Sequence, residues 1–348
     1  MFDPDRIAAP LRGRQAPSRT VHASFTPISQ ICPIVRSNWA MGRPQQGDAM
    51  TVIAVNAEGP LPVAAAPLRA IIDNLTPGAP VTIMLHGYRF SPASPATDPH
   101  ISIYAPVPRR RDGRTLSWSR RLGLVGTRLG IGFGWRADGT LWRAQAEAAQ
   151  AGLALARLIA RLRDAGAGPV GLIGHSLGGR VALSALAHLD PGDVGRIVLL
   201  SAAEFRGPAQ QALATPAGRA AHVLNVTSRE NDLYDKAFEL LVGGPHGPDG
   251  CALGAGLDAP NAVTVQIDDP RHRDGLRALG YPTAAPVRRI CHWSAYMRPG
   301  LFPLYRAFLH RPDTLTLPML RAVLPADTAP RWSRLFTRPL PAARFAAE

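Results

Sequence analysis

The stretch VGLIGHSLGGRVALSALAHL at residues 170–189 decides the fold class. Its first four residues form a short apolar run typical of a buried strand, and from Gly178 to Leu189 apolar residues recur at helical spacing. Between them lies a G-x-S-x-G pattern centred on Ser176. The pattern alone is weak, because a chain with 33 glycines matches it by chance in roughly one case in eight. With a strand before it and a helix after it, it predicts a nucleophile elbow, a sharp turn that lifts the serine hydroxyl above a sheet edge.

The same alternation of apolar runs and amphipathic stretches extends in both directions from the elbow. Strands are expected at residues 51–55, 81–85, 129–135, 169–173, 196–201, 222–226 and 262–267. Helices are expected at residues 64–75, 141–164, 178–189 and 299–309. Short, continuously apolar strands separated by helices are typical of a parallel sheet that is buried on both faces. We therefore predict an α/β fold of the α/β-hydrolase type, with a mostly parallel central sheet and helices on both faces.

Three segments depart from this pattern. Residues 1–49 are rich in Pro and Arg without periodicity, so we expect an extension or linker, and Met41 and Met50 suggest a later translation start. Residues 50–310 form the expected domain, and 311–348 a tail packing on it. Within the domain, residues 89–128 form an insertion with weak periodicity and an arginine-rich stretch at 109–121. Such a segment is either a solvated loop or a lid facing an anionic substrate or a membrane.

Composition and charge exclude several classes of protein. With 348 residues, 46% of them hydrophobic, the chain can bury a large core and is not a disordered protein. No apolar run is long enough for a transmembrane helix. The formal charge of +14 comes from arginine, since Lys236 is the single lysine among 39 basic residues. That bias is typical of GC-rich coding, and no binding motif accompanies it, so we expect no nucleic-acid partner.

The cysteines and the N-terminus bear on localisation. Cys32, Cys251 and Cys291 are odd in number and far apart, so they predict neither a disulfide framework nor a metal-binding pair. The first residues lack the apolar core of a signal peptide. We expect a reducing, cytoplasmic environment.

A serine hydroxyl becomes a nucleophile only when a base takes its proton and an acid orients that base. On this fold the chain order is serine, acid, histidine. Asp232 follows the strand at 222–226 at the same sheet edge as the elbow, and we expect it to be the acid. Glu230 and Asp235 are close competitors, and Glu204 is a third candidate.

The base should be a restrained histidine that is neutral near pH 7. His292 lies in the apolar stretch ICHWSAY and is the expected base. His272 lies in a highly charged segment that resembles a solvated turn, and His246 in a loop rich in Gly and Pro is an outside candidate.

The oxyanion formed during acyl transfer needs two backbone N–H donors. Leu177 supplies the first, because it follows the serine. Tyr88, in the loop after the strand at 81–85, is expected to supply the second. His86 is expected to brace this loop, and His175 to pack behind the elbow.

Four stretches carry a resemblance to a known superfamily: HGYRFSP (86–92), GHSLGG (174–179), NVTSREND (225–232) and CHWSAYMRPGLF (291–302). Over residues 51–309 the chain resembles the lipase/esterase-like branch of the α/β-hydrolase superfamily, including α/β hydrolases of alphaproteobacteria. The first two stretches are specific to the superfamily, and the other two are less so. No HGGG signature is present, which disfavours the hormone-sensitive-lipase branch.

The resemblance implies a triad of Ser176, Asp232 and His292, with Leu177 and Tyr88 at the oxyanion hole. The expected activity is hydrolysis of a small carboxylic ester or thioester through an acyl-enzyme, without a metal or organic cofactor. Two alternatives stay open: an acyltransferase that uses the same triad, and a non-catalytic binding protein on the same fold. The sequence does not set the oligomeric state.

Overall fold

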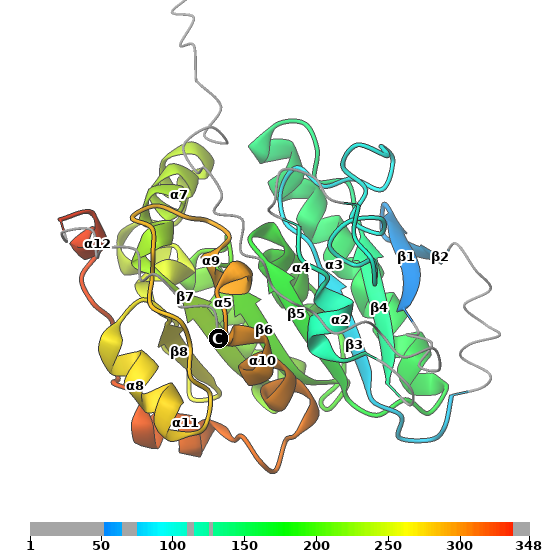
Figure 1. Cartoon of the computed structure of the whole chain (residues 1–348). Helices are drawn as coiled ribbons and strands as arrows, with labels where there is room; N and C mark the ends of the chain where they lie inside the picture. Colours follow the sequence, from blue (N-terminus) through cyan, green and yellow to red (C-terminus); the bar gives the residue numbers. More distant parts are fainter. Residues whose placement is uncertain (1–51, 65–74, 110–114, 125–127, 337–348) are drawn as a thin grey trace, which may run out of the picture. The chain divides into compact units, whose positions relative to one another are not determined.

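The computed structural model describes residues 52–64, 75–109, 115–124 and 128–336 of the chain (Figure 1). All of them belong to one compact unit of the chain. The extension expected at 1–49 lies outside the described residues. So do positions 65–74 of the helix expected at 64–75 and three arginines of the insertion, Arg110, Arg111 and Arg114.

The described residues form an eight-stranded sheet in the order β2-β1-β4-β3-β5-β6-β7-β8. Its strands are β1 (Val52–Glu58), β2 (Leu61–Ala64), β3 (Val81–Leu85), β4 (Leu129–Gly134), β5 (Val170–His175), β6 (Val194–Leu200), β7 (His222–Thr227) and β8 (Ala262–Gln266). Every neighbouring pair is parallel except the β1–β2 hairpin at one edge. Every residue of β3, β4 and β5 is buried, as expected for strands covered on both faces. The predicted α/β fold with a mostly parallel sheet is confirmed.

The α-helices are α2 (Trp118–Leu122), α3 (Leu141–Asp164), α4 (Leu177–Ala185), α5 (Arg206–Ala214), α6 (Pro216–Ala220), α7 (Asp232–Phe238), α8 (Pro270–Ala278), α9 (Ser294–Met297), α10 (Leu301–His310), α11 (Leu317–Val323) and α12 (Ser333–Phe336). Shorter turns are the 3-10 segments η2 (Leu186–His188), η3 (Arg229–Asn231), η5 (Gly247–Gly250) and η6 (Leu253–Ala255), and the π turn η4 (Glu239–Gly243).

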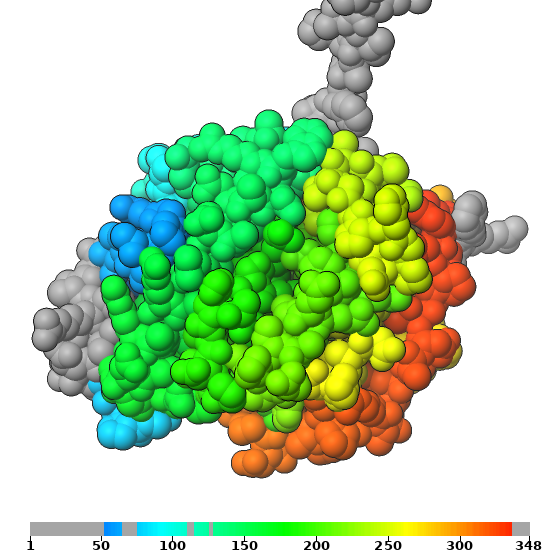
Figure 2. All heavy atoms as spheres, turned by 180° about the vertical axis from the view of Figure 1, so that it is seen from behind, coloured from blue at the N-terminus to red at the C-terminus, as the bar shows by residue number. Residues whose placement is uncertain are grey.

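Residues of the central strands β3, β5, β6 and β7 enter two hydrophobic cores, one on each face of the sheet. In β6, Ile197 and Leu199 pack into the core beneath α3, α4 and α5, whereas Val198 and Leu200 pack into the core beneath α2, α8, α10 and α11. Figure 1 shows α2, α8 and α10 in front of the sheet. Figure 2 shows the opposite face, where the green segments of the chain that include α3, α4 and α5 form the surface. The helices therefore cover both faces, as predicted.

The insertion at 89–128 contains more structure than its sequence indicates. Its described part includes α2, which begins after the N-cap Ser117 and ends at Gly123 in the left-handed conformation (φ 65°). Tyr104, Trp118 and Leu122 from this insertion are at most 1% exposed and belong to the second core. The expectation of a solvated loop is therefore wrong for this part, because three large side chains anchor it to the sheet.

The strand order reverses between β3 and β5. After β3 the chain adds β4 on one side, and it then returns to place β5 on the other side of β3. In open parallel sheets the crevice beyond the carboxyl ends of the strands at such a point is where ligands bind. The loop at 86–88 follows β3, and Ser176 follows β5, so both lie at this crevice.

Candidate active site

Ser176 occupies a strained turn between β5 and α4. Its backbone has φ 54° and ψ −126°, a conformation that costs a residue other than glycine about 1–3 kcal/mol. Three backbone hydrogen bonds hold it there: the Ser176 N–H donates to Leu200 O at 3.0 Å, and Ser176 O accepts from the Gly179 N–H at 3.0 Å and from the Ala203 N–H at 2.9 Å. The backbone geometry is that of an elbow, and the side chain lies at the carboxyl edge of the sheet.

The glycines around Ser176 are required by close packing. A Cβ on Gly174 would come within 2.6 Å of Gly178 O, and one on Gly178 within 2.4 Å of Leu85 O. Real Cβ atoms do not approach that closely, so larger residues would push the first turn of α4 away from β3 and β5. The G-x-S-x-G pattern therefore reflects the packing of this turn.

The loop after β3 lies directly against the serine. A Cβ on Gly87 would be 2.7 Å from the Ser176 Cβ and 2.8 Å from His175 O. The Tyr88 hydroxyl donates to Gly139 O at 2.6 Å. No hydrogen bond from the Tyr88 N–H is found within the described chain. The Leu177 N–H lies in the first turn of α4, whose amides have no acceptor inside the helix. Both donors expected at an oxyanion hole therefore remain available.

His86 fixes the shape of this loop and cannot act as a base. Its Nδ1 bonds Gly87 O at 3.0 Å, and its Nε2 lies 3.1 Å from the Trp135 N–H. Because Nε2 accepts, the proton sits on Nδ1. The Trp135 ring stacks on the imidazole with 5.3 Å between centroids. Burial lowers the pKa of His86 to about 3, so it stays neutral and braces the loop, as expected.

His292 lies just before α9 and contacts His175, the residue that precedes Ser176 in the elbow. The two imidazole centroids are 4.5 Å apart, and His175 Nε2 lies 3.0 Å from the backbone oxygen of His292. Tyr234 also stacks on the His292 ring, with 4.7 Å between centroids. Burial, with a smaller contribution from His175, lowers the pKa of His292 well below 6.5. The imidazole is therefore neutral at pH 7 and can accept a proton.

The orientation of His292 is set by Asn231. His292 Nδ1 lies 2.6 Å from Asn231 Oδ1. An amide oxygen can only accept, so Nδ1 carries the proton and Nε2 keeps its lone pair. No hydrogen bond between His292 Nε2 and Ser176 Oγ is formed among the described residues. Catalytic hydrogen bonds of this kind are often long before substrate binds.

Asp232 was the sequence-based choice for the orienting acid, but the structure gives it different partners. Its Oδ1 pairs with Arg229 at 3.2 Å, both side chains being 1% exposed, and its Oδ2 accepts from the Trp332 N–H at 2.7 Å. The competitors Glu230 and Glu204 are likewise paired, with Arg298 and Arg180. The sequence did not single out Asn231, because a carboxylate is the usual group at this position, although Cys-His-Asn triads show that an amide can fill it.

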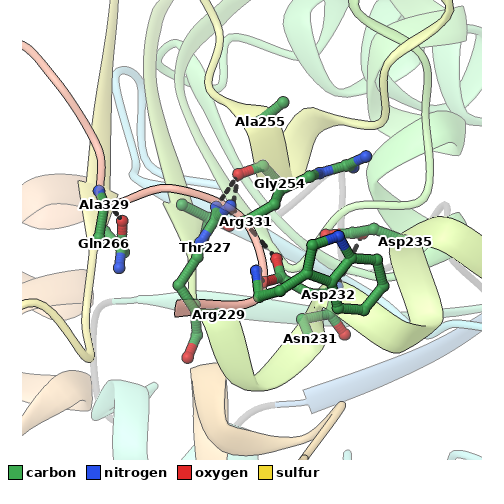
Figure 3. A network of polar contacts seen from close by, with 12 residues as sticks. Thr227, Arg229, Asn231, Asp232, Asp235, Gly254, Ala255, Gln266, Ala329 and Arg331 are labelled. Atoms are coloured by element: carbon green, nitrogen blue, oxygen red, sulfur yellow. Dashed lines mark hydrogen bonds and ion pairs between the residues drawn. The ribbon is translucent and has the colours of Figure 1, made fainter. Parts of the chain in front are cut away.

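Asp235, the remaining competitor, lies behind Asn231. Its Oδ1 accepts from Asn231 Nδ2 at 2.8 Å, and its side chain is buried. Figure 3 shows Asn231 and Asp235 beside Asp232 and Arg229, with Gly254 and Arg331 completing the network. Burial raises the pKa of Asp235 from 3.8 to about 7. The described residues thus form a chain of two hydrogen bonds from His292 through Asn231 to a buried carboxyl group.

His272 is not in a solvated turn, contrary to expectation. It is fully buried in α8, where its Nδ1 accepts from the Gln266 N–H at 3.4 Å and its Nε2 contacts Asp327 O at 3.2 Å. The tail residue Asp327 covers it, which the local charge pattern could not reveal. His246 is exposed. Within the described part of the chain, neither histidine forms a hydrogen bond with Ser176.

A surface pocket of about 490 Å³ opens beyond Trp135, at the ends of β1 and β4. Its lining residues are Asn56, Ala57, Glu58, Gly59, Pro92, Ala93, Trp135, Arg136, Glu147 and Ala151. Ser176 is not among them, so this pocket is distinct from the elbow. Within the part of the chain that the structure describes, no cluster of three or more His, Cys, Asp or Glu side chains could hold a metal ion. No described helix combines the length and apolar character needed to cross a membrane.

Comparisons with known proteins add little to this geometry. No protein-family model matches the chain, and no curated protein matches its sequence. Among solved structures, prolyl oligopeptidase B from Galerina marginata is similar at 14% identity and a TM-score of 0.24. The match covers 53% of this chain and 30% of that one. A likeness of this size carries no argument about function, so the functional proposal rests on the residues described above.

Proposed function

We propose that this protein is a serine hydrolase of the α/β-hydrolase type that cleaves a carboxylic ester or thioester through an acyl-enzyme on Ser176. The observation that carries the proposal is the strained elbow at Ser176, with Gly87 packed on its Cβ and with the preceding residue, His175, in contact with His292. Strain of this kind persists only where the surrounding structure imposes it, and it concentrates at active sites.

In the proposed first step, Ser176 Oγ attacks the carbonyl carbon while His292 Nε2 takes the hydroxyl proton. The developing oxyanion accepts hydrogen bonds from the backbone N–H groups of Leu177 and Tyr88. Collapse of the tetrahedral intermediate breaks the bond to the leaving oxygen or sulfur, which receives the proton from His292. A water molecule then repeats the sequence on the acyl-enzyme and restores the free hydroxyl of Ser176.

Asn231 takes the orienting role that the sequence assigned to Asp232. Its amide oxygen holds the Nδ1 proton of His292, so the lone pair is on Nε2, the nitrogen that would accept the serine proton. A neutral amide stabilises the imidazolium less than a carboxylate does, which makes the group behind the amide important.

Burst kinetics with p-nitrophenyl esters of increasing acyl length test this proposal. Wild type should release one equivalent of p-nitrophenol rapidly and then turn over more slowly, because the acyl-enzyme forms before it hydrolyses. Ser176→Ala should abolish both phases. Ser201→Ala is the matched control, since Ser201 is also buried, has positive φ (43°) and follows the neighbouring strand β6.

Equal hydrolysis by wild type and Ser176→Ala, or no hydrolysis of any ester by wild type, would overturn the proposal. Adding alcohol acceptors separates hydrolysis from acyl transfer, because a transferase would give the new ester in place of the free acid.

A further inference from the structure

We propose that Asp235 is a positioning residue for His292 and acts through the side-chain amide of Asn231. The inference rests on the proposed function and extends the catalytic chain by one buried carboxyl group. Asp235 does not contact Ser176 or His292 in the structure. Its influence on the base runs through two hydrogen bonds that share the Asn231 amide.

The two hydrogen bonds have a fixed direction. Asn231 Nδ2 donates to Asp235 Oδ1 at 2.8 Å, which leaves the amide oxygen to accept from His292 Nδ1 at 2.6 Å. If the amide were turned over, its NH₂ group would face Nδ1 and its oxygen would face a carboxyl oxygen. Asp235 therefore selects the amide orientation, and that orientation selects the histidine tautomer required of a base.

Asp235 differs from the other acids of its segment. Residues 229–239 contain four carboxyl groups, and three of them pair with an arginine among the described residues: Glu230 with Arg298, Asp232 with Arg229, and Glu239 with Arg331. Asp235 has no ion pair within the described chain, although it is 3% exposed. A buried carboxyl group without a cation is costly for the fold. Its one side-chain hydrogen bond is the bond to Asn231.

The backbone around Asp235 is shaped to seat a carboxyl group. A Cβ on Gly254 would lie 1.8 Å from Asp235 Oδ2, so the glycine leaves room for that oxygen. Oδ2 is buried and has no hydrogen-bond partner in the structure. Gly254 O is held in turn by Arg229 and by the Thr227 hydroxyl, the latter at 3.2 Å. The carboxyl group is thus fixed by its surroundings while one oxygen stays unpaired.

Four charged groups surround Asp235 and set its ionisation. Arg331 and Arg229 favour the carboxylate and lower its pKa, whereas Asp232 and Glu239 oppose it. Burial also opposes the carboxylate and is the largest of these effects, so the pKa of Asp235 is raised. When ionised, Asp235 polarises the Asn231 amide and makes its oxygen a better acceptor. This stabilises the imidazolium that forms as His292 takes the proton. The neutral imidazole of the resting enzyme is stabilised less than the imidazolium of the transition state. The contribution of Asp235 should therefore appear in kcat.

Isosteric substitution separates the charge from the hydrogen bond. Asp235→Asn keeps an acceptor for Asn231 Nδ2 but removes the charge, and we expect kcat to fall roughly 10-fold with KM unchanged. Asp235→Ala removes both and should cost more. The double variant Asn231→Asp/Asp235→Asn puts the carboxylate directly on His292, with an amide behind it, and should recover most of the lost kcat. Asp269→Asn is the matched control and should keep wild-type kcat, because Asp269 is a buried aspartate paired with Arg271 that contacts neither Asn231 nor His292.

Two further readouts distinguish positioning from a structural role. Asp235→Asn should unfold at the same or a higher temperature than wild type at pH 8, since it removes an unpaired buried charge. The pH profile of kcat should lose the contribution of a group that ionises near neutrality. Lower activity with lower thermal stability and an unchanged pH profile would overturn the inference.

Fluorophosphonate labelling of Ser176 keeps this test separate from the proposed function. If wild type is not labelled, the proposed function fails and the inference fails with it. If wild type is labelled and Asp235→Asn matches it in labelling rate and kcat, only the role of Asp235 is refuted. Slower labelling and lower kcat in a folded Asp235→Asn protein, with recovery in the double variant, is the expected result.

Discussion

Replacing Asp235 by asparagine should slow the reaction. It should also change the free energy of unfolding relative to wild type, and this difference should favour the variant more at pH 8 than at pH 5. The substitution changes one buried oxygen to an NH₂ group and keeps the acceptor for Asn231. In wild type, burial raises the pKa of Asp235 from 3.8 to about 7. The folded protein therefore binds more protons than the unfolded chain between these values, and stability is lost as pH rises from about 4 through 7.

The magnitude follows from the size of the shift. Each pKa unit corresponds to about 1.4 kcal/mol, so ionising Asp235 in the folded state costs at most about 4 kcal/mol in full. About 3 kcal/mol of this falls between pH 5 and pH 8. The Asp235→Asn variant has no titrating group at this position, so it should lose none of this stability between pH 5 and pH 8. For a domain of this size, that difference corresponds to a change of roughly 5 °C in relative Tm.

Urea titrations at pH 5, 6, 7 and 8 measure the effect as the difference in free energy of unfolding between the two proteins. The difference should move in favour of Asp235→Asn as pH rises and level off above pH 7. Asp269→Asn is the control: hydrogen bonds from Arg271 outweigh burial and lower the pKa of Asp269. Its contribution is lost only in acid below its ordinary pKa, so its difference should stay constant from pH 5 to 8. A constant difference for Asp235→Asn would refute the reasoning.

Three more predictions follow from the site. Gly87→Ala should abolish ester hydrolysis, because its Cβ would lie 2.7 Å from that of Ser176; wild-type kcat would show that the loop does not border the nucleophile. Asp232→Asn should lower the free energy of unfolding in urea by about 3–5 kcal/mol by breaking the buried pair with Arg229. Its kcat per folded molecule should stay within a few-fold of wild type, whereas a large loss at unchanged stability would make Asp232 the orienting acid. In Asp235→Asn, which lacks the group that ionises near neutrality, activity should fall in acid only as His292 is protonated, so the acid limb of kcat/KM should lie below pH 6.5; a limb above that pH in this variant would contradict the burial of the imidazole.

Much of the fold was predictable because buried strands are recognisable in the sequence as short apolar runs. The strand at Val81–Leu85 and the helix at Leu141–Asp164 have the predicted bounds. The edge strand Leu61–Ala64 was missed because it is four residues long and half exposed. Helix α2 was missed because five residues cannot display a helical period, and its burial depends on contacts far away in sequence.

The site was predictable as far as local patterns reach. Ser176 stands out through its glycines, and His292 through its apolar surroundings. The choice between Asn231 and Asp232 was not predictable, because neighbouring residues in a helical turn point about 100° apart. Which one faces His292 depends on how η3 passes into α7. The burial of His272 likewise depends on the tail, which local sequence does not place.

Intact-mass analysis after fluorophosphonate treatment tests the central claim most directly. Wild type and Ser201→Ala should each gain one adduct, located by peptide mapping at Ser176, and Ser176→Ala should gain none. Equal labelling of wild type and Ser176→Ala, or an adduct mapped to another residue, would contradict the assignment of Ser176 as the activated nucleophile.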